Sequence, residues 1–463
     1  MKSVKFGVSL LVASSIVASA AFNCLADETS TVNVDASTGD ETVSVGNIDV
    51  TSGDGADVYA SNGNTATLTV DGNITANDDG IQAGANDSGS VVVTVNGDIA
   101  APNDDALYMD VYDNGNATVT VNGNLSAEDG MNIYDHDSGS TDVTVNGNIT
   151  STDDAIYFYV ENQGSISVTV DGDISAGYYG ISGYCDEESS VSVSVTGNIE
   201  AEVAALEIDA SEGSTVDIDV TGNLTGKSDK APAVGIWGYD GDSKTTILID
   251  GDITGTQKGI YAYLEETDYL DMVVTGVITG AEVPVRVSND SEYTDDNFTL
   301  TAWKIVPNSD GIIADAALYY SVDYDPANEA VDFEKSINYI VKYDQPSEGG
   351  TISAKATDGS ALAQYGGYDT AREAQSIILS ADLEDGYEIV AAYNGEAKTP
   401  LTKDADGNYV VEVERGGGLL FSVELQYVSS AQTGEGGYSY LIGAVILLAG
   451  GCVALTKIRK KEA

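Results

Sequence analysis

Basic side chains are scarce in this chain. Lysine and arginine together number 19 against 75 aspartates and glutamates, which gives the 463 residues a net charge of −56. Between residues 30 and 292 the basic residues are few and late; they are Lys227, Lys230, Lys244, Lys258 and Arg286. Such a negative field repels nucleic acid, so we expect no nucleic-acid partner. We expect no cofactor either, although the carboxylates allow Ca²⁺ to bind; simple solvation of an acidic surface is the alternative.

Cysteine and histidine are also scarce. Cys24 and Cys452 lie in apolar terminal segments, which leaves Cys185 alone between them and excludes an internal disulfide framework. The single histidine, His136, stands in the loop sequence DHDSG between Asp135 and Asp137. These two aspartates are the candidate metal ligands, and a solvated loop is the alternative. Without a nucleophile motif, a phosphate loop or a cysteine cluster, the sequence predicts a non-enzymatic protein.

Both ends carry membrane signals. Residues 1–26 combine two early lysines, an apolar run and small residues, the pattern of a signal peptide. Residues 438–456 are apolar enough for a transmembrane helix, and the basic residues of 457–463 place that tail in the cytoplasm. We therefore expect the remainder of the chain on the extracellular face of a bacterial cell.

A short phrase repeats along the first two thirds of the chain. It reads TVDGNI at 69–74, TVNGDI at 94–99 and TVNGNL at 120–125, and its glycines recur at 46, 72, 97, 123, 147, 172, 197, 222, 251 and 276. Most spacings are 24 to 26 residues; one, from 222 to 251, is 29. A constant period of this kind predicts stacked units that cannot fold singly.

Alternation of period 2 makes each unit a set of strands. Val119, Val121 and Leu125 are expected to point inward, with Thr118 and Thr120 outward. Asn-Gly between apolar residues also predicts hairpins, which would give a stack of antiparallel pairs instead. The fixed offset of a second strand favours a parallel coil of about ten rungs, a rod about 50 Å long. Over roughly residues 40–290 this pattern resembles the right-handed parallel β-helix of pectate-lyase-like proteins and bacterial adhesins, and we assign residues 30–292 to the β-helix domain.

The rest of the extracellular part divides into shorter segments. A transition segment at 293–336 precedes a small all-β, sandwich-like module at 337–428, whose GGTISA and LSADLEDGYEIV stretches resemble repeat modules of Gram-positive surface proteins. The linker 429–437 contains SAQTGE, which resembles a cell-wall sorting signal at Thr433 and Gly434. Ser430 and Ala431 stand where that signal has Leu-Pro, so a plain membrane anchor is the alternative to attachment at the cell wall.

Aromatic residues mark a candidate binding surface. Counted from the first apolar residue of each second strand, the outward positions hold Tyr108, Tyr134, Tyr157, Tyr159, Tyr184, Trp237, Tyr239, Tyr261 and Tyr263. Tyr134, Tyr159 and Tyr184 fall on successive rungs and are expected to form one column, with Asp110 before it and Asp209 after it. Aromatic rings beside carboxylates suit sugar rings, although outward tyrosines can also serve only to stabilise a sheet.

Three functions remain open from the sequence. The first is an adhesin-like protein that binds glycans or a host or neighbouring cell surface. The second is a β-helix polysaccharide lyase or glycoside hydrolase, which needs a basic residue or paired carboxylates. The third is a passive surface stalk.

Overall fold

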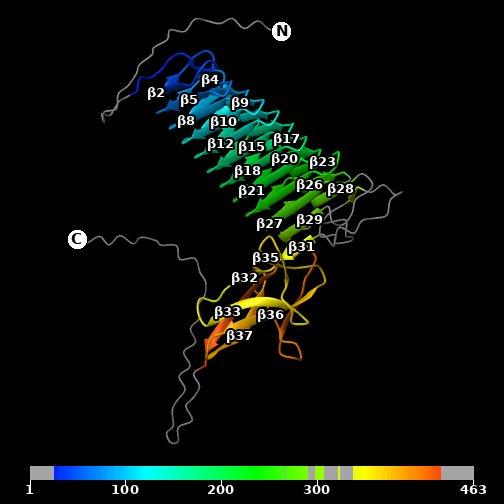
Figure 1. Ribbon diagram of the computed structural model, residues 1–463. Helices are drawn as coiled ribbons and strands as arrows, with labels where there is room; N and C mark the ends of the chain where they lie inside the picture. The colour runs from blue at the N-terminus through cyan, green and yellow to red at the C-terminus, as the bar shows by residue number, and fades with distance from the viewer. Residues whose placement is uncertain (1–24, 266, 290–297, 307–321, 324–336, 429–463) are drawn as a thin grey trace, which may run out of the picture.

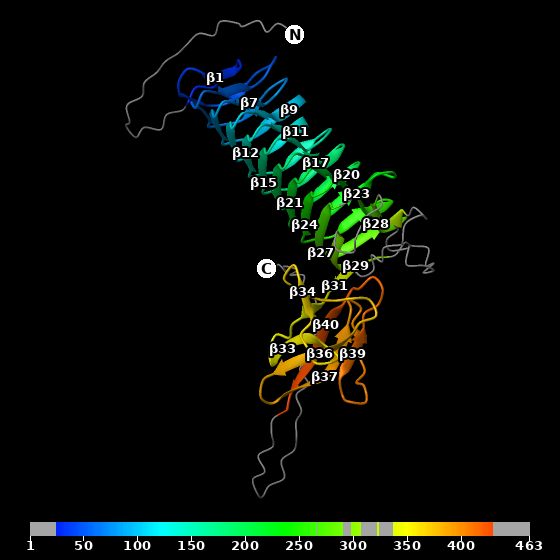
Figure 2. The same ribbon diagram turned by 45° about the vertical axis from the view of Figure 1, so that its right-hand side comes forward.

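The computed structural model describes residues 25–265, 267–289, 298–306, 322–323 and 337–428, and every regular element among them is a strand. The strands stack into a long rod that begins near the N-terminus and carries a small module at its far end (Figures 1 and 2). No helix in the described part is long and apolar enough to cross a membrane. The expected signal peptide (except residues 25 and 26), the sorting-like Thr433 and Gly434 and the span 438–456 lie outside that part.

Three stacks of parallel strands form the faces of the rod. The first, which we call the phrase face, carries the repeated phrase; it consists of β2 (Glu41–Val45), β5 (Thr65–Val70), β8 (Ser90–Val95), β10 (Asn116–Val121), β12 (Ser140–Val145), β15 (Ser165–Val170), β18 (Ser190–Val195), β21 (Thr215–Val220), β24 (Lys244–Ile249), β27 (Tyr269–Gly280), β29 (Phe298–Ile305) and β31 (Ile337–Ile340).

The second stack is the short face, whose strands follow the glycine turn that recurs in each unit. It consists of β3 (Ile48–Asp49), β6 (Ile74–Thr75), the first residues of β9 (Ile99–Val111) and β11 (Leu125–Asp135), β13 (Ile149–Ser151), β16 (Ile174–Ala176), β19 (Ile199–Ala201), β22 (Leu224–Gly226), β25 (Ile253–Gly255) and the last residues of β27.

The third stack is the tyrosine face, which carries most of the predicted site residues. It consists of β1 (Val32–Ala36), β4 (Ala56–Ala60), β7 (Ile81–Ala85), the last residues of β9 and β11, β14 (Ile156–Val160), β17 (Tyr179–Cys185), β20 (Ala204–Ser211), β23 (Pro232–Tyr239), β26 (Lys258–Leu264), β28 (Val283–Asn289) and β30 (Val322–Asp323).

The pairing of these strands decides between the two architectures that the repeat allowed. Strands of successive units pair in parallel along each face; Thr69 of β5 lies beside Thr94 of β8, which lies beside Thr120 of β10. The parallel coil is therefore confirmed over the hairpin stack. It has about eleven turns, and its phrase face extends past the ten glycine-bearing units, because β29 and β31 continue the face without the glycine phrase.

The interior of the rod is filled by the inward half of each strand. Val119, Val121 and Leu125 are at most 1% exposed, as the alternation predicted, and the same positions in the other glycine-bearing units hold Val, Ile, Leu or Met. Each fully buried Val, Leu or Ile contributes roughly 1.5–3 kcal/mol, so a continuous column of them across the units stabilises the stack without disulfides. Cys185 belongs to this interior at 1% exposed and acts as a small filler.

The turn after each phrase strand holds neighbouring units together through its glycine and the residue that follows. At Gly147 a Cβ atom would lie 2.5 Å from the carbonyl oxygen of Gly123, one rung earlier, so only glycine allows this spacing. The next residue, Asn148, donates its backbone N–H to Asn124 Oδ1 and accepts the N–H of Asp173 at Oδ1. The ladder repeats at Asp27, Asn47, Asn73, Asp98, Asn124, Asn148, Asp173, Asn198, Asn223 and Asp252.

The module after the rod contains two small sheets. One has the order β32 (Lys342–Asp344), β40 (Leu420–Tyr427), β37 (Tyr387–Asn394) and β38 (Thr399–Pro400), and the other β33 (Gly350–Ala356), β36 (Ser376–Leu383) and β39 (Tyr409–Glu412). The hairpin of β34 (Ala363–Tyr365) and β35 (Tyr368–Ala371) attaches to β31, which itself extends the rod. Trp303 Nε1 of β29 also donates to Leu419 O at 3.0 Å, so the rod and the module share strand pairing and hydrogen bonds.

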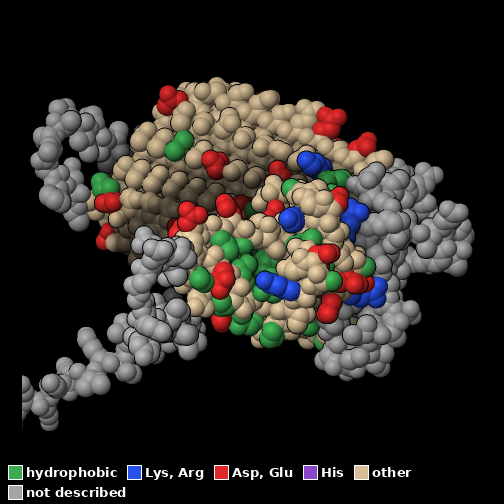
Figure 3. All heavy atoms as spheres, turned by 90° about the horizontal axis from the view of Figure 1, so that it is seen from below, with side chains coloured by type: hydrophobic (Ala, Val, Ile, Leu, Met, Phe, Trp, Pro, Cys, Tyr) green, Lys and Arg blue, Asp and Glu red, His purple; other side chains and the backbone are tan. Residues whose placement is uncertain are grey.

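Charge is distributed unevenly between these parts. Residues 6–226 contain neither lysine nor arginine. In the view from the module end, the blue lysine and arginine side chains gather on the part nearest the viewer (Figure 3). Most of the rod therefore presents carboxylates without neighbouring side-chain cations.

Candidate functional site: the tyrosine face

A central column of outward side chains runs along the tyrosine face. The strand register places Tyr134, Tyr159 and Tyr184 on successive rungs, with Asp110 before them and Asp209 after them, in the order expected from the sequence. The rings of Tyr159 and Tyr184 are 6.3 Å apart, and Tyr184 is 49% exposed. From Tyr59 onward the column reads Tyr59, Gly84, Asp110, Tyr134, Tyr159, Tyr184, Asp209, Trp237 and Tyr263.

A second column of the same face interleaves with the central one. Tyr108 and Tyr157 lie in it, and their rings are 5.6 Å and 6.0 Å from the ring of Tyr134 between them. Burial raises the pKa of Tyr108 and of Tyr157 to about 12, so both hydroxyls stay protonated and remain donors at neutral pH. The two columns together form a tilted array of rings that is half-buried at its base.

The register corrects the placement of two predicted residues. Counting from Ile236 put Trp237 beside Glu207 and Tyr239 beside Asp209, whereas the structure pairs Trp237 with Asp209 and Tyr239 with Ser211. The cause is the unit of 29 residues: Val234 rather than Ile236 is the partner of Leu206. A shift of two residues keeps a side chain on its face but moves it by one column.

The last rungs of the face carry the remaining predicted aromatics. Tyr263 pairs with Trp237 in the central column, and Tyr261 pairs with Gly235 in the second column. Lys258 Nζ and Arg286 Cζ lie 5.7 Å and 5.8 Å from the centre of the Tyr261 ring. Cationic side chains therefore accompany the aromatic rings at this end of the face, in contrast to the earlier rungs.

His136 lies at the edge of the same face, directly after β11, and its side chain is only 14% exposed to solvent. Its ring stacks on Tyr112 with centroids 4.6 Å apart, and Nδ1 is 2.8 Å from Glu161 Oε1. Tyr159 donates its hydroxyl to the other oxygen of Glu161 at 2.8 Å. The bond from Tyr159, with a smaller contribution from His136, lowers the pKa of Glu161. The array therefore fixes the orientation of Glu161, which sequence reasoning did not single out.

The expected metal pair does not meet. Asp135 pairs with Val111 and Val160, so its side chain points into the core and is 0% exposed. Asp137 is exposed and lies in a turn with φ of 51°. The alternation that carries Val111 and Val160 inward continues through Asp135, whereas the left-handed turn carries Asp137 away from the core.

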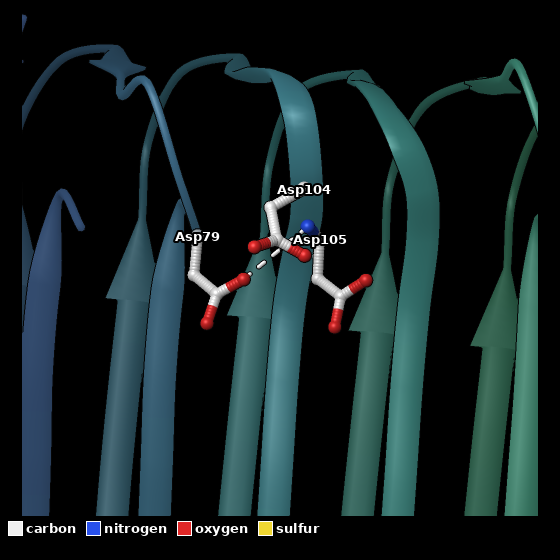
Figure 4. Close-up of side chains that lie close together, drawn as sticks. All are labelled: Asp79, Asp104 and Asp105. Carbon is white, nitrogen blue, oxygen red and sulfur yellow. Dashed lines mark hydrogen bonds between the residues drawn. The ribbon is translucent and has the colours of Figure 1, made fainter. Parts of the chain in front are cut away.

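Another group of carboxylates has the spacing of a metal site. Asp79, Asp104 and Asp105 each offer an oxygen atom within 4.8 Å of the others, and the close-up shows them on neighbouring rungs (Figure 4). Asp79 Oδ1 already accepts the backbone N–H of Asp105 at 3.3 Å, and both oxygens of Asp105 accept bonds from Asn132. Burial raises the pKa of Asp79 and of Asp105 to about 7, so protons compete with any cation at neutral pH.

Two exposed tyrosines of the face were missed by sequence reasoning. Tyr59 and Tyr112 are each 38% exposed. Tyr59 was passed over because its strand begins at Ala56 rather than at a large apolar residue, and Tyr112 because it lies five residues after Leu107, beyond the counted positions. The sequence contained a usable signal for Tyr112, because it lies four residues after Tyr108 and therefore on the same side of an alternating strand.

Comparison of the chain with protein families, with curated proteins and with solved structures gives no match. The arguments that follow therefore rest on the residues of this chain alone.

Proposed function

We propose that this protein is a non-enzymatic, adhesin-like surface protein that binds glycan through the tyrosine face. The observation that carries the proposal is the register that lines up Tyr134, Tyr159 and Tyr184 between Asp110 and Asp209. Tyrosine rings pack against the C–H faces of sugars, and the carboxylates accept hydrogen bonds from sugar hydroxyls. A column that continues over several rungs suits a polymer better than a single small molecule.

The negative charge of the rod restricts the classes of glycan that it can bind. With no lysine or arginine in residues 6–226, the face has no side-chain cation to pair with sulfate or uronate groups over its first eight rungs. Acidic polysaccharides are repelled by such a surface. The proposed ligands are therefore neutral or amine-bearing glycans on a host or neighbouring cell.

A glycan array probed with the purified chain tests this function. The variant with Tyr134, Tyr159 and Tyr184 all changed to Ala should lose binding by at least tenfold. The matched control changes Thr120, Thr144 and Thr169 to Ala, because these residues form an outward column on the phrase face of the same rungs. Both variants should keep the far-ultraviolet circular dichroism of the parent. Equal binding by the parent and the tyrosine variant would refute the proposed face, and an empty array would support a passive stalk.

The proposed location places the rod outside the cell. Residues 1–26 would direct export and residues 438–456 would tether the chain to the membrane, or Thr433 to the cell wall. Deletion of 438–463 should then release the protein into the medium. Retention of the shortened chain on the cells would contradict the tether.

A second candidate is a glycoside hydrolase of β-helix type, and one observation favours it. Asp79 and Asp105 have pKa values raised to about 7 by burial, the range in which a carboxyl can act as a general acid. Asp104 next to them is exposed. Release of reducing ends from neutral polysaccharides by the parent, and its loss in Asp79→Asn and Asp105→Asn, would establish this candidate and overturn the first.

A further inference from the structure

The aromatic side chains in the middle of the tyrosine face form two rows that advance by one rung at each step. One row consists of Tyr108, Tyr134 and Tyr157, and the other of Tyr112, His136, Tyr159 and Tyr184. Neighbouring ring centres are 5.6 Å and 6.0 Å apart in the first row, and 4.6 Å, 5.7 Å and 6.3 Å apart in the second. The two rows, which we call the ring array, cover the four successive rungs of β9, β11, β14 and β17.

The ring array ends on both sides. On the rung before it, β7 carries Gly84 in the central column, and Gly84 lines a cavity of about 260 Å³ over β4, β7 and β9. On the rung after it, β20 contains no aromatic residue and presents Glu207 and Asp209 outward. A ligand that follows the rings therefore finds them on four rungs in succession.

The placement of the rings favours a ligand that runs along the rod over one that crosses it. Across the rod, the rungs of β9, β11 and β14 each hold two rings of the array, whereas along the rod the rows hold three and four. Neighbouring strands of a sheet are roughly 4.8 Å apart, so a polymer along the rod meets a new ring each time it advances by that distance. In an extended β-1,4-linked glycan each sugar advances the chain by nearly one such strand separation.

The shape of a β-1,4-linked chain also suits the face. Successive sugars are turned by half a turn, so the extended chain of glucose-type sugars is a flat ribbon with C–H groups on both sides. Such a ribbon can lie on the surface of a sheet and pack against one ring after another. An α-1,4-linked chain winds into a helix instead, so its sugars leave a flat surface after a few units.

An acceptor for sugar hydroxyl groups lies beside the rings. Glu161 has a side chain that is 29% exposed, and Tyr159 and His136 hold its two oxygens at 2.8 Å. A carboxylate oxygen can accept more than one hydrogen bond, so Glu161 can receive a hydroxyl group of the ligand while its orientation stays fixed. Hydroxyl groups supply such donors without the negative charge that this acidic rod would repel.

We propose that the ring array binds an extended, neutral β-1,4-linked glycan that lies along the rod, with one sugar over each of the four rungs. The inference rests on the proposed function and adds the linkage, the direction and the length of the bound segment. Polymers of glucose and of N-acetylglucosamine share this backbone, and the test distinguishes them.

Titration calorimetry on the full-length chain tests the linkage and the length. The probes are cello-oligosaccharides, N-acetylated chito-oligosaccharides and malto-oligosaccharides, each of two to six sugars. We expect one β-1,4-linked series to bind at least tenfold more tightly than the α-1,4-linked malto series of equal length, which identifies the sugar. Its affinity should rise at least threefold with each sugar up to four, and by no more than about threefold in total beyond that. Equal affinities for the two linkages, or no rise beyond two sugars, would refute the inference.

Tyr184→Ala tests the direction of the bound chain. Tyr184 is the last ring of the array, and its side chain is 49% exposed, so its removal leaves the core intact. The variant should bind four sugars no more tightly than three, while its affinity for three sugars stays within about twofold of the parent, because three rungs keep their rings. Tyr427→Ala is the matched control: this tyrosine is 60% exposed on the module, and the variant should behave as the parent. Equal weakening of every probe by Tyr184→Ala would refute a chain that lies along the rod.

The failure of this inference is distinguishable from the failure of the proposed function. If no oligosaccharide binds and the glycan array is empty, both are overturned. If the variant of Tyr134, Tyr159 and Tyr184 loses binding to a glycan without β-1,4 linkages, the proposed function stands and the extended ribbon is refuted.

Discussion

Replacing Asp135 should stabilise the rod at neutral and alkaline pH. Its carboxyl group is fully buried between Val111 and Val160 of the neighbouring rungs. Burial raises its pKa to about 8; Thr141 and nearby backbone groups lower it only in part, since neither carboxyl oxygen has a hydrogen-bond partner among the described residues. An aspartate in the unfolded chain ionises near pH 4, so over the range between these values the folded state holds a proton that the unfolded state has released.

The sign and size of the effect follow from this difference. The free energy of unfolding falls by up to about 1.4 kcal/mol for each pH unit between about 4 and 8, and is constant above that range. The total contribution of Asp135 is therefore about 6 kcal/mol, as an upper bound. Asp135→Asn removes the titrating carboxyl group, and Asp135→Val also matches the apolar neighbours. The free energy of unfolding of both variants should therefore rise relative to that of the parent as the pH rises, and the valine variant should show the larger difference.

Urea unfolding at pH 4, 6 and 8, followed by tryptophan fluorescence, measures this gain. Other aspartates with raised pKa values, such as Asp79 and Asp105, contribute a similar slope to every variant, so the informative quantity is the difference between variant and parent. Asp137→Asn, at an exposed position two residues away, is the control and should show no difference. A difference for Asp135→Asn that does not grow with pH would refute a protonated carboxyl group in the core.

Three further predictions concern the stack itself. Gly147→Ala should lower the stability severely or prevent folding, because its Cβ would meet the Gly123 carbonyl at 2.5 Å, whereas Gly39→Ala, which meets nothing within 4 Å, should leave the melting temperature unchanged. Asn148→Ala should cost about 0.5–1.5 kcal/mol in urea unfolding, because the N–H of Asp173 loses its acceptor; a neutral result would show that water replaces the ladder. Burial raises the pKa of Cys185 to about 12, so the thiol should react slowly with iodoacetamide in the native protein and rapidly in denaturant; fast native labelling would mean that this rung opens.

The candidate site was predictable only in part. The column of Tyr134, Tyr159 and Tyr184 followed from parity and from units of 25 residues, because equal units place equivalent residues side by side. The alternation of inward and outward residues did not suffice to place Trp237 in a column, because the extra residues of the longer unit can be accommodated at either end of the strand. The position of these extra residues depends on whether Val234 or Ile236 lies beside Leu206, and the structure places Val234 there.

Local sequence also could not distinguish the two aspartates beside His136. Asp135 is inward because the parallel pairing of its strand extends to it, while Asp137 lies in the turn that begins two residues later. The cavity at Gly84 was equally hidden, since it depends on Tyr59 and Tyr112, which come from the rungs on either side. Contacts between side chains on different rungs are set by register, and register is a property of the assembled stack.

The sequence by itself determined that the chain is a stack of strands, which side chains fill its interior and that its surface is acidic, because period 2 and a constant repeat leave few other ways to bury the valine and isoleucine columns. The tertiary structure decided that the stack is parallel, which tyrosines share a column and where a cavity opens among them. These features arise between rungs, where the turn conformation and core packing of each unit fix its position against the next.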